Sequence, residues 1–154
     1  NAKDVKAAVQ KAIDENADLK KQVEAAVRER VGQLKGRLIE SAKEVDGVKV
    51  IAQVLPMDVE AGAVKDLAFQ VSGQLPENTF LVLGSKHDDK PLLTVMVSKD
   101  LIASRQLHAG NLVKEAARLI QGGGGGAPHF ATAGGKNTAG LDEAVAKVLE
   151  IAGF

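Results

Sequence analysis

The sequence predicts an α/β protein in which a long, coiled-coil-like N-terminal helix precedes a small α/β globule with a mixed sheet and a glycine-rich loop. Three observations support this class. Apolar residues recur at three- and four-residue steps over residues 3–45, short β-branched runs alternate with helical patterns after residue 47, and five consecutive glycines occupy residues 122–126. The 154 residues, 45% hydrophobic and 26% charged, are sufficient for one compact domain with an appendage.

The helical pattern over residues 3–45 contains no proline and resembles a heptad seam. The seam is weak, because alanine and valine dominate it, Asn16 interrupts it, and Gly32 and Gly36 each cost about 1 kcal/mol of helix propensity. Such a helix needs a partner surface. Three arrangements would provide this surface: the helix lies on its own domain as a linker, it continues an upstream helix, or it dimerises with a second copy. The seam positions proposed for a homodimer are Val5, Val9, Leu19, Val23, Leu34 and Leu38.

A turn at Asp46 and Gly47 divides the chain into a helical subdomain, residues 1–46, and a globular domain, residues 47–154. The first strand of the globule is expected at residues 48–55. A helix of about sixteen residues then opens at residues 57–60, with Asp58 as its N-cap. The chain starts at Asn1 with the helical pattern already under way, so we expect it to be a piece of a longer protein.

The rest of the globule is expected to contain a hairpin and two more helices. Apolar runs at residues 80–85 and 92–97 flank a polar segment, which is typical of a hairpin with a charged loop. Helices are predicted at residues 108–121 and 141–152, on either side of the glycine loop. The whole globule therefore combines three to five strands with helices packed on them.

Composition and spacing argue against several functions. Basic and acidic residues balance at 20 each, so any nucleic-acid binding must come from a local patch, and the chain has no cysteine for disulfides or thiolate chemistry. No apolar run reaches membrane-spanning length, and we expect a cytoplasmic protein without a membrane partner. His87, His108 and His129 lack zinc-ligand spacing. Ser85, His87 and Asp88 are interpreted as loop residues, so no catalytic or metal residue is predicted.

The glycine-rich segment is the most informative stretch, with seven glycines among residues 122–135. Glycine loses more conformational freedom on folding than other residues, so something must require bare backbone there. The segment matches neither a P-loop nor a G-x-G-x-x-G turn. Two interpretations are open: the glycines let two elements pack closely, or their N–H groups form an anion-binding concavity or a platform for a base.

The motif Gly-Gly-Gly-Gly-Gly-x-Pro-x-x-Ala-x-Ala-Gly-Gly resembles the glycine-rich signature of the C-terminal domain of alanyl-tRNA synthetases, shared in looser form with DHH-type phosphoesterases. The resemblance covers nearly the whole chain. It implies a non-catalytic RNA-binding domain that grips the outer corner of tRNA, where the D and T loops meet. It also implies that this domain couples aminoacylation and editing modules in a parent alanine–tRNA ligase. It implies no cofactor for this chain, and ATP, magnesium and zinc for the parent enzyme, whose tRNA is alanine-specific.

Family members commonly show Arg-Pro-Asp-Met where this chain has Ala-Pro-His-Phe at residues 127–130, so one possible phosphate contact is lost. We expect RNA contacts from nearby cations and the glycine backbone: Lys114, Arg118, Gly122, Gly123, Gly124, Gly125, Gly126, His129 and Lys136. Two other interpretations remain, the substrate-binding domain of a DHH-type phosphoesterase and a dimerisation module without RNA binding.

Overall fold

The structure is a computed structural model that describes residues 2–154. Its contacts divide the chain into two compact units, Asn1–Leu34 and Lys35–Phe154. Helix α1, Ala2–Glu40, makes up the described part of the first unit and enters the second. No helix among the described residues is long and apolar enough to cross a membrane. The predicted division at residue 46 remains a prediction.

The long helix ends earlier than its pattern predicts, at Glu40 rather than residue 45. Strand β1, Lys43–Val45, pairs antiparallel with β2, Val48–Asp58, through a two-residue turn. Both turn residues, Asp46 and Gly47, have positive φ angles of 50° and 78°. Such turns match the twist of paired strands, and Asp-Gly is among the strongest hairpin signals. The turn therefore joins two paired strands, and residues 43–45, which were expected to be helical, form strand β1.

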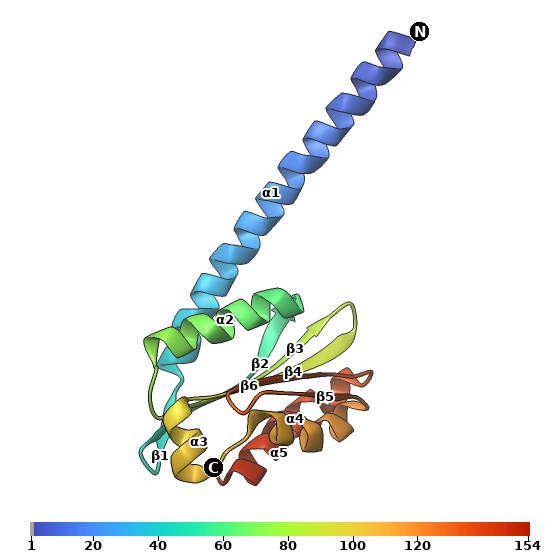
Figure 1. The fold of residues 1–154 in the computed structure, drawn as a ribbon. Helices are drawn as coiled ribbons and strands as arrows, with labels where there is room; N and C mark the ends of the chain where they lie inside the picture. Colours follow the sequence, from blue (N-terminus) through green and yellow to red (C-terminus); the bar gives the residue numbers. More distant parts are fainter. Residues whose placement is uncertain (1) are drawn as a thin grey trace. The chain divides into compact units, whose positions relative to one another are not determined.

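A six-stranded mixed sheet forms the centre of the second unit, in the order β1-β2-β3-β4-β6-β5 (Figure 1). Strands β2 and β3 are parallel, and every other neighbouring pair is antiparallel. Helix α2, Ala61–Gln74, makes the crossover that a parallel pair requires. The mixed α/β class is thus confirmed, with six strands instead of three to five. The later strands are β3 (Thr79–His87), β4 (Lys90–Val97), β5 (Gly123–Gly126) and β6 (Phe130–Gly134).

Helices cover both faces of this sheet, with α2 on one face and α4 and α5 on the other (Figure 1). Alternating side chains of β3 reach both layers. Phe80 and Val82 belong to the core cluster that includes Val113 of α4 and Val148 of α5, and Leu81 between them is also buried. A strand buried on both faces reads as a continuous apolar run. The remaining helices are α3 (Lys99–Arg105), α4 (Ala109–Ala117), η1 (Arg118–Ile120), η2 (Thr138–Gly140) and α5 (Leu141–Ala152).

Several element boundaries differ from the predictions. Asp58 ends β2 and does not cap α2, whose N-cap is Glu60. The predicted hairpin is present, but its strands run up to the two-residue turn at Asp88 and Asp89, which both have positive φ. The predicted second helix divides into α4 and η1, and the short α3 was not predicted. The third predicted helix, residues 141–152, is confirmed as α5.

Candidate nucleic-acid interface

Four of the five glycines, residues 123–126, form an edge strand of the sheet rather than a loop, and Gly122 immediately precedes it. Strand β5 pairs with β6 alone, at the end of the strand order. A β-carbon added at Gly122, Gly124 or Gly126 would overlap a backbone carbonyl oxygen of β6. The approach of the two backbones therefore requires glycine at these three alternate positions, which supports the close-packing interpretation for them.

The two intervening glycines have no such requirement. A β-carbon at Gly123 would meet nothing within 4 Å, and one at Gly125 would make only an ordinary 3.4 Å contact with Cε of Lys114. Gly134, the partner of Gly123 in the β5–β6 register, is similarly open, because a β-carbon there would have its nearest neighbour at 4.0 Å. None of the three has a left-handed φ. Close packing therefore does not require glycine at these three positions.

A pocket of about 470 Å³ lies at one end of this glycine strand. Its cationic side chains are Lys90 and Lys136, and its bare backbone comes from Gly122, Gly134 and Gly135. The backbone N–H of Lys136 donates to the carbonyl of Ile120 at 2.9 Å, which fixes this residue beside the strand. The lining surface of this pocket is mainly apolar, and Lys90 and Lys136 are the lining residues whose ammonium groups could bind an anion such as a phosphate. The other lining residues are Val59, Ala61, His87, Pro91, Leu92 and Gln121.

The predicted cations do not form a single cluster. Lys114 of α4 lies beside Gly125, whereas Lys136 lines the pocket. Arg118 in η1 is exposed and faces Glu115 at 4.0 Å, a pairing of little energetic weight. His129 lies in the β5–β6 connection and lines a different groove. The structure therefore brings Lys114 and Lys136 to the glycine segment and places His129 apart from the pocket.

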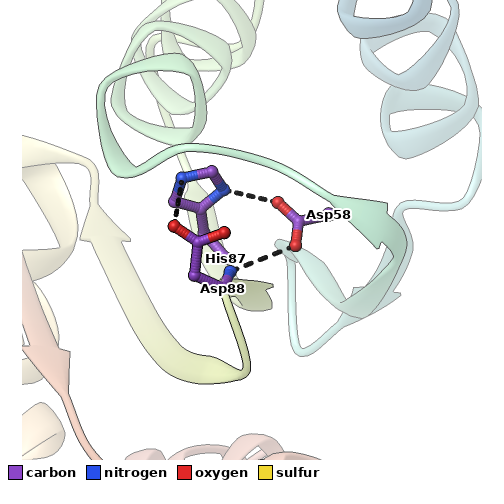
Figure 2. A group of neighbouring side chains, drawn as sticks. All are labelled: Asp58, His87 and Asp88. Carbon is purple, nitrogen blue, oxygen red and sulfur yellow. Dashed lines mark hydrogen bonds and ion pairs between the residues drawn. The ribbon is translucent and has the colours of Figure 1, made fainter.

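Asp58, His87 and Asp88 form a cluster at the protein surface (Figure 2). His87 also helps to line the pocket. Asp58 Oδ1 is 2.5 Å from His87 Nδ1, and its Oδ2 accepts the backbone N–H of Asp88 at 3.2 Å. This hydrogen bond raises the pKa of His87 above its ordinary value and lowers that of Asp58. A protonated His87 would add positive charge beside Lys90.

Sequence reasoning missed Asp58 as the partner of His87, because 29 residues separate them. Ser85, the nearer candidate, is fully buried, and its hydroxyl has no hydrogen-bond partner among the described residues. Ligand atoms of Asp58, His87 and Asp88 lie within 4.8 Å of one another, and carboxylate and imidazole are types found in metal sites. All three side chains face solvent to a large extent, and the expected absence of a metal site remains a prediction.

The proposed dimerisation residues divide into two groups. Val5, Val9, Leu19 and Val23 are exposed by 53–63%, and Ile13, which was not among them, is exposed by 56%. Leu34 and Leu38 are buried, with exposed fractions of 4% and 0%. A second helix could therefore reach the first group in this conformation of the chain, but not the side chains of the last two.

The chain belongs to the DHHA1 domain family, whose family model matches residues 47–153. It is 57% identical over all 154 residues to the alanine–tRNA ligase of Bacteroides fragilis strain YCH46. The chain spans 17% of the length of that relative, so it matches one part of the ligase.

Solved structures show the same relationship. The C-Ala domain of the Aquifex aeolicus alanyl-tRNA synthetase matches 74% of this chain and 99% of its own, with 26% identity and a TM-score of 0.63. A structure described as a DHH domain shares the fold at 15% identity and a TM-score of 0.51, over 86% of this chain and 32% of its own. The recognised similarity to the C-terminal domain of alanyl-tRNA synthetases is thus confirmed.

Proposed function

We propose that this chain is the tRNA-binding C-terminal domain of an alanine–tRNA ligase. In this role it grips the outer corner of the tRNA and couples the aminoacylation and editing modules of the parent enzyme. The similarity to alanyl-tRNA synthetases supports the parent enzyme, and the glycine edge supports the binding mode. The carrying observation is that Gly123, Gly125 and Gly134 have no steric reason to be glycine, while Lys114 and Lys136 lie beside this bare backbone.

Binding through this edge would depend on shape and charge. Exposed peptide N–H groups and ammonium groups recognise phosphates and 2′-hydroxyls without reading a duplex sequence. The net charge of the chain is zero, so the local cations would supply the electrostatic attraction. The proposed contact set is Lys114, Arg118, His129, Lys136 and the backbone of residues 122–126. Salt-dependent binding of tRNA, compared with a single-stranded oligonucleotide, tests the proposal.

The parent ligase would need cofactors and a tRNA partner of its own. ATP, magnesium and zinc would serve modules of the ligase that this chain does not span, and the ligase would act in the cytoplasm. A ligase with this domain would use alanine-specific tRNA as its partner.

We also propose a second role for the first unit, a homodimer contact through α1. The exposed residues Val5, Val9, Leu19 and Val23 support it, because large apolar side chains at such spacing are unusual on a helix that meets only water. The dependence of mass on concentration tests this role independently of RNA.

A further inference from the structure

A pair of phenylalanines on the second unit has one ring open to solvent. The chain has four phenylalanines and no tryptophan or tyrosine. Phe80 is fully buried and pairs with Phe154. Phe69 of α2 pairs with Phe130 of β6, with ring centroids 5.1 Å apart and ring planes tilted by 34°. Phe69 is 45% exposed, which makes it the most exposed aromatic ring among the described residues.

The buried stripe of α2 does not include this ring. The buried stripe of the helix consists of Val64, Leu67, Ala68 and Val71. Phe69 lies outside that stripe, where it packs on Phe130 and stays 45% exposed. An exposed aromatic residue off the apolar face points to a binding role.

The surroundings of Phe69 favour a nucleobase with an attached phosphate. Nζ of Lys65 lies 6.0 Å from the Phe69 ring centroid. A groove of about 470 Å³ runs beside the ring, and Lys99 and His129 contribute the ionisable groups among its described lining, which contains no carboxylate. The other lining residues are Ser72, Pro76, Met96, Val97 and Ser98. A flat apolar ring flanked by cations suits a base that stacks and a backbone that is anionic.

The aromatic pair is continuous with the glycine edge. Phe130 is the first residue of β6, and its carbonyl accepts the N–H of Ala127, immediately after β5. The pocket with Lys136 includes Gly134 at the other end of β6. Four residue steps along a strand span about 13 Å. Phe130 and the pocket-lining Gly134 therefore lie within reach of one short RNA segment.

We propose that an unpaired nucleobase of the bound RNA stacks on Phe69, while its sugar-phosphate backbone follows β5 towards Lys136. This inference rests on the proposed RNA-binding function and assigns a stacking subsite to it. His129 would contact the same RNA segment near the stacked base, because it lines the groove beside Phe69 rather than the pocket.

The test measures binding of fluorescein-labelled tRNA for alanine to the full 154-residue chain. Stacking on an aromatic side chain predicts that Phe69→Ala and Phe69→Leu weaken binding roughly 5- to 100-fold. The salt slope should stay unchanged, because no phosphate contact is removed. Ile151→Ala is the matched control, since Ile151 is a comparably exposed apolar residue at 43%. It should bind like the parent chain, and Phe69→Leu, which keeps an apolar contact with Phe130, should melt closer to the parent temperature than Phe69→Ala.

A spectroscopic readout separates stacking from a general loss of affinity. Phe69→Trp introduces a single indole into a chain without tryptophan, and stacking of a base should quench its emission when tRNA is added. Unchanged affinity of Phe69→Ala and unchanged indole emission with bound tRNA would overturn the stacking subsite and leave the proposed function standing. If Phe69→Ala changed only the self-association of the chain and not its affinity for tRNA, the stacking subsite would also be overturned. Failure of the parent chain to bind tRNA would overturn both proposals.

Discussion

Asp58 at the end of β2 holds His87 at the end of β3, with Oδ1 and Nδ1 2.5 Å apart (Figure 2). The two strands run parallel, so their C-terminal ends meet at the same edge of the sheet. The turn that follows β3 returns the N–H of Asp88 to the same carboxylate. Residues far apart in the sequence thereby raise the pKa of an imidazole that helps to line the pocket.

This pair predicts a pH dependence. The raised pKa of His87 contributes stability that is fully present below its ordinary value of 6.5 and is lost as the pH rises through the raised value. The lowered pKa of Asp58 contributes stability above 3.8, which is lost as the pH falls through the lowered value. Both groups are exposed, so solvent screening keeps the effect on stability small.

Removing the carboxylate should return the imidazole to ordinary behaviour. We expect Asp58→Asn to lower the pKa of His87, as measured by NMR titration of the histidine ring protons. Asp88→Asn, which removes the weaker neighbour at 3.4 Å, should shift it less. An unchanged His87 titration in Asp58→Asn would show that the pair does not form in solution.

The glycine strand predicts opposite outcomes at adjacent positions. Gly124→Ala should displace β5 and lower the melting temperature, because its β-carbon would overlap the β6 backbone, and overpacking costs about 1–3 kcal/mol. Gly123→Ala should melt like the parent chain, because no atom lies within 4 Å, yet bind tRNA more weakly. Thermal unfolding and tRNA titration of both variants check this. A stable Gly123→Ala variant with full affinity would exclude that backbone as a contact.

Charge removal should change the salt dependence of binding. Replacing Lys114, Arg118 and Lys136 by glutamine should weaken tRNA binding and reduce the slope of log affinity against log salt by roughly one for each lost phosphate contact. Lys147→Gln is the control, since Lys147 pairs with Glu150 at 3.6 Å on α5. Parent-like affinity and slope in the triple variant would remove these cations from the interface.

The α1 proposal concerns association alone. Val9→Glu combined with Val23→Glu should convert a dimer into a monomer in sedimentation equilibrium, because charge replaces two exposed apolar contacts. Gln22→Glu adds a charge next to the seam and should leave the mass unchanged. A parent chain that is monomeric at every concentration would contradict this role.

Patterns that the sequence carries locally were predictable. The amphipathic α5 and the alternation of strands and helices follow from apolar spacing, and Asp46-Gly47 was identified as a turn. The strand formed by residues 123–126 was not predictable from propensity, because glycine is depleted in strands and forms one here only through close pairing with β6.

The candidate interface was only partly predictable for a similar reason. Lys114 and Lys136 were found by their nearness in sequence to the glycines, whereas the pairing of Asp58 with His87 depends on tertiary structure. The exposure of Phe69 could have been predicted from the sequence, because this aromatic residue falls outside the apolar stripe of its helix. Which glycines serve packing and which remain open depends on how closely β5 approaches β6, which the sequence does not show.

The most direct measurement is binding of labelled tRNA for alanine to this chain at two salt concentrations, beside a generic tRNA and a single-stranded oligonucleotide. We predict salt-sensitive binding to both tRNAs, well above the single strand, because shape and phosphates at the outer corner would be recognised. Preference for the single strand would contradict the account and favour a phosphoesterase-like substrate domain. Absence of binding to all three would contradict it and leave an assembly module.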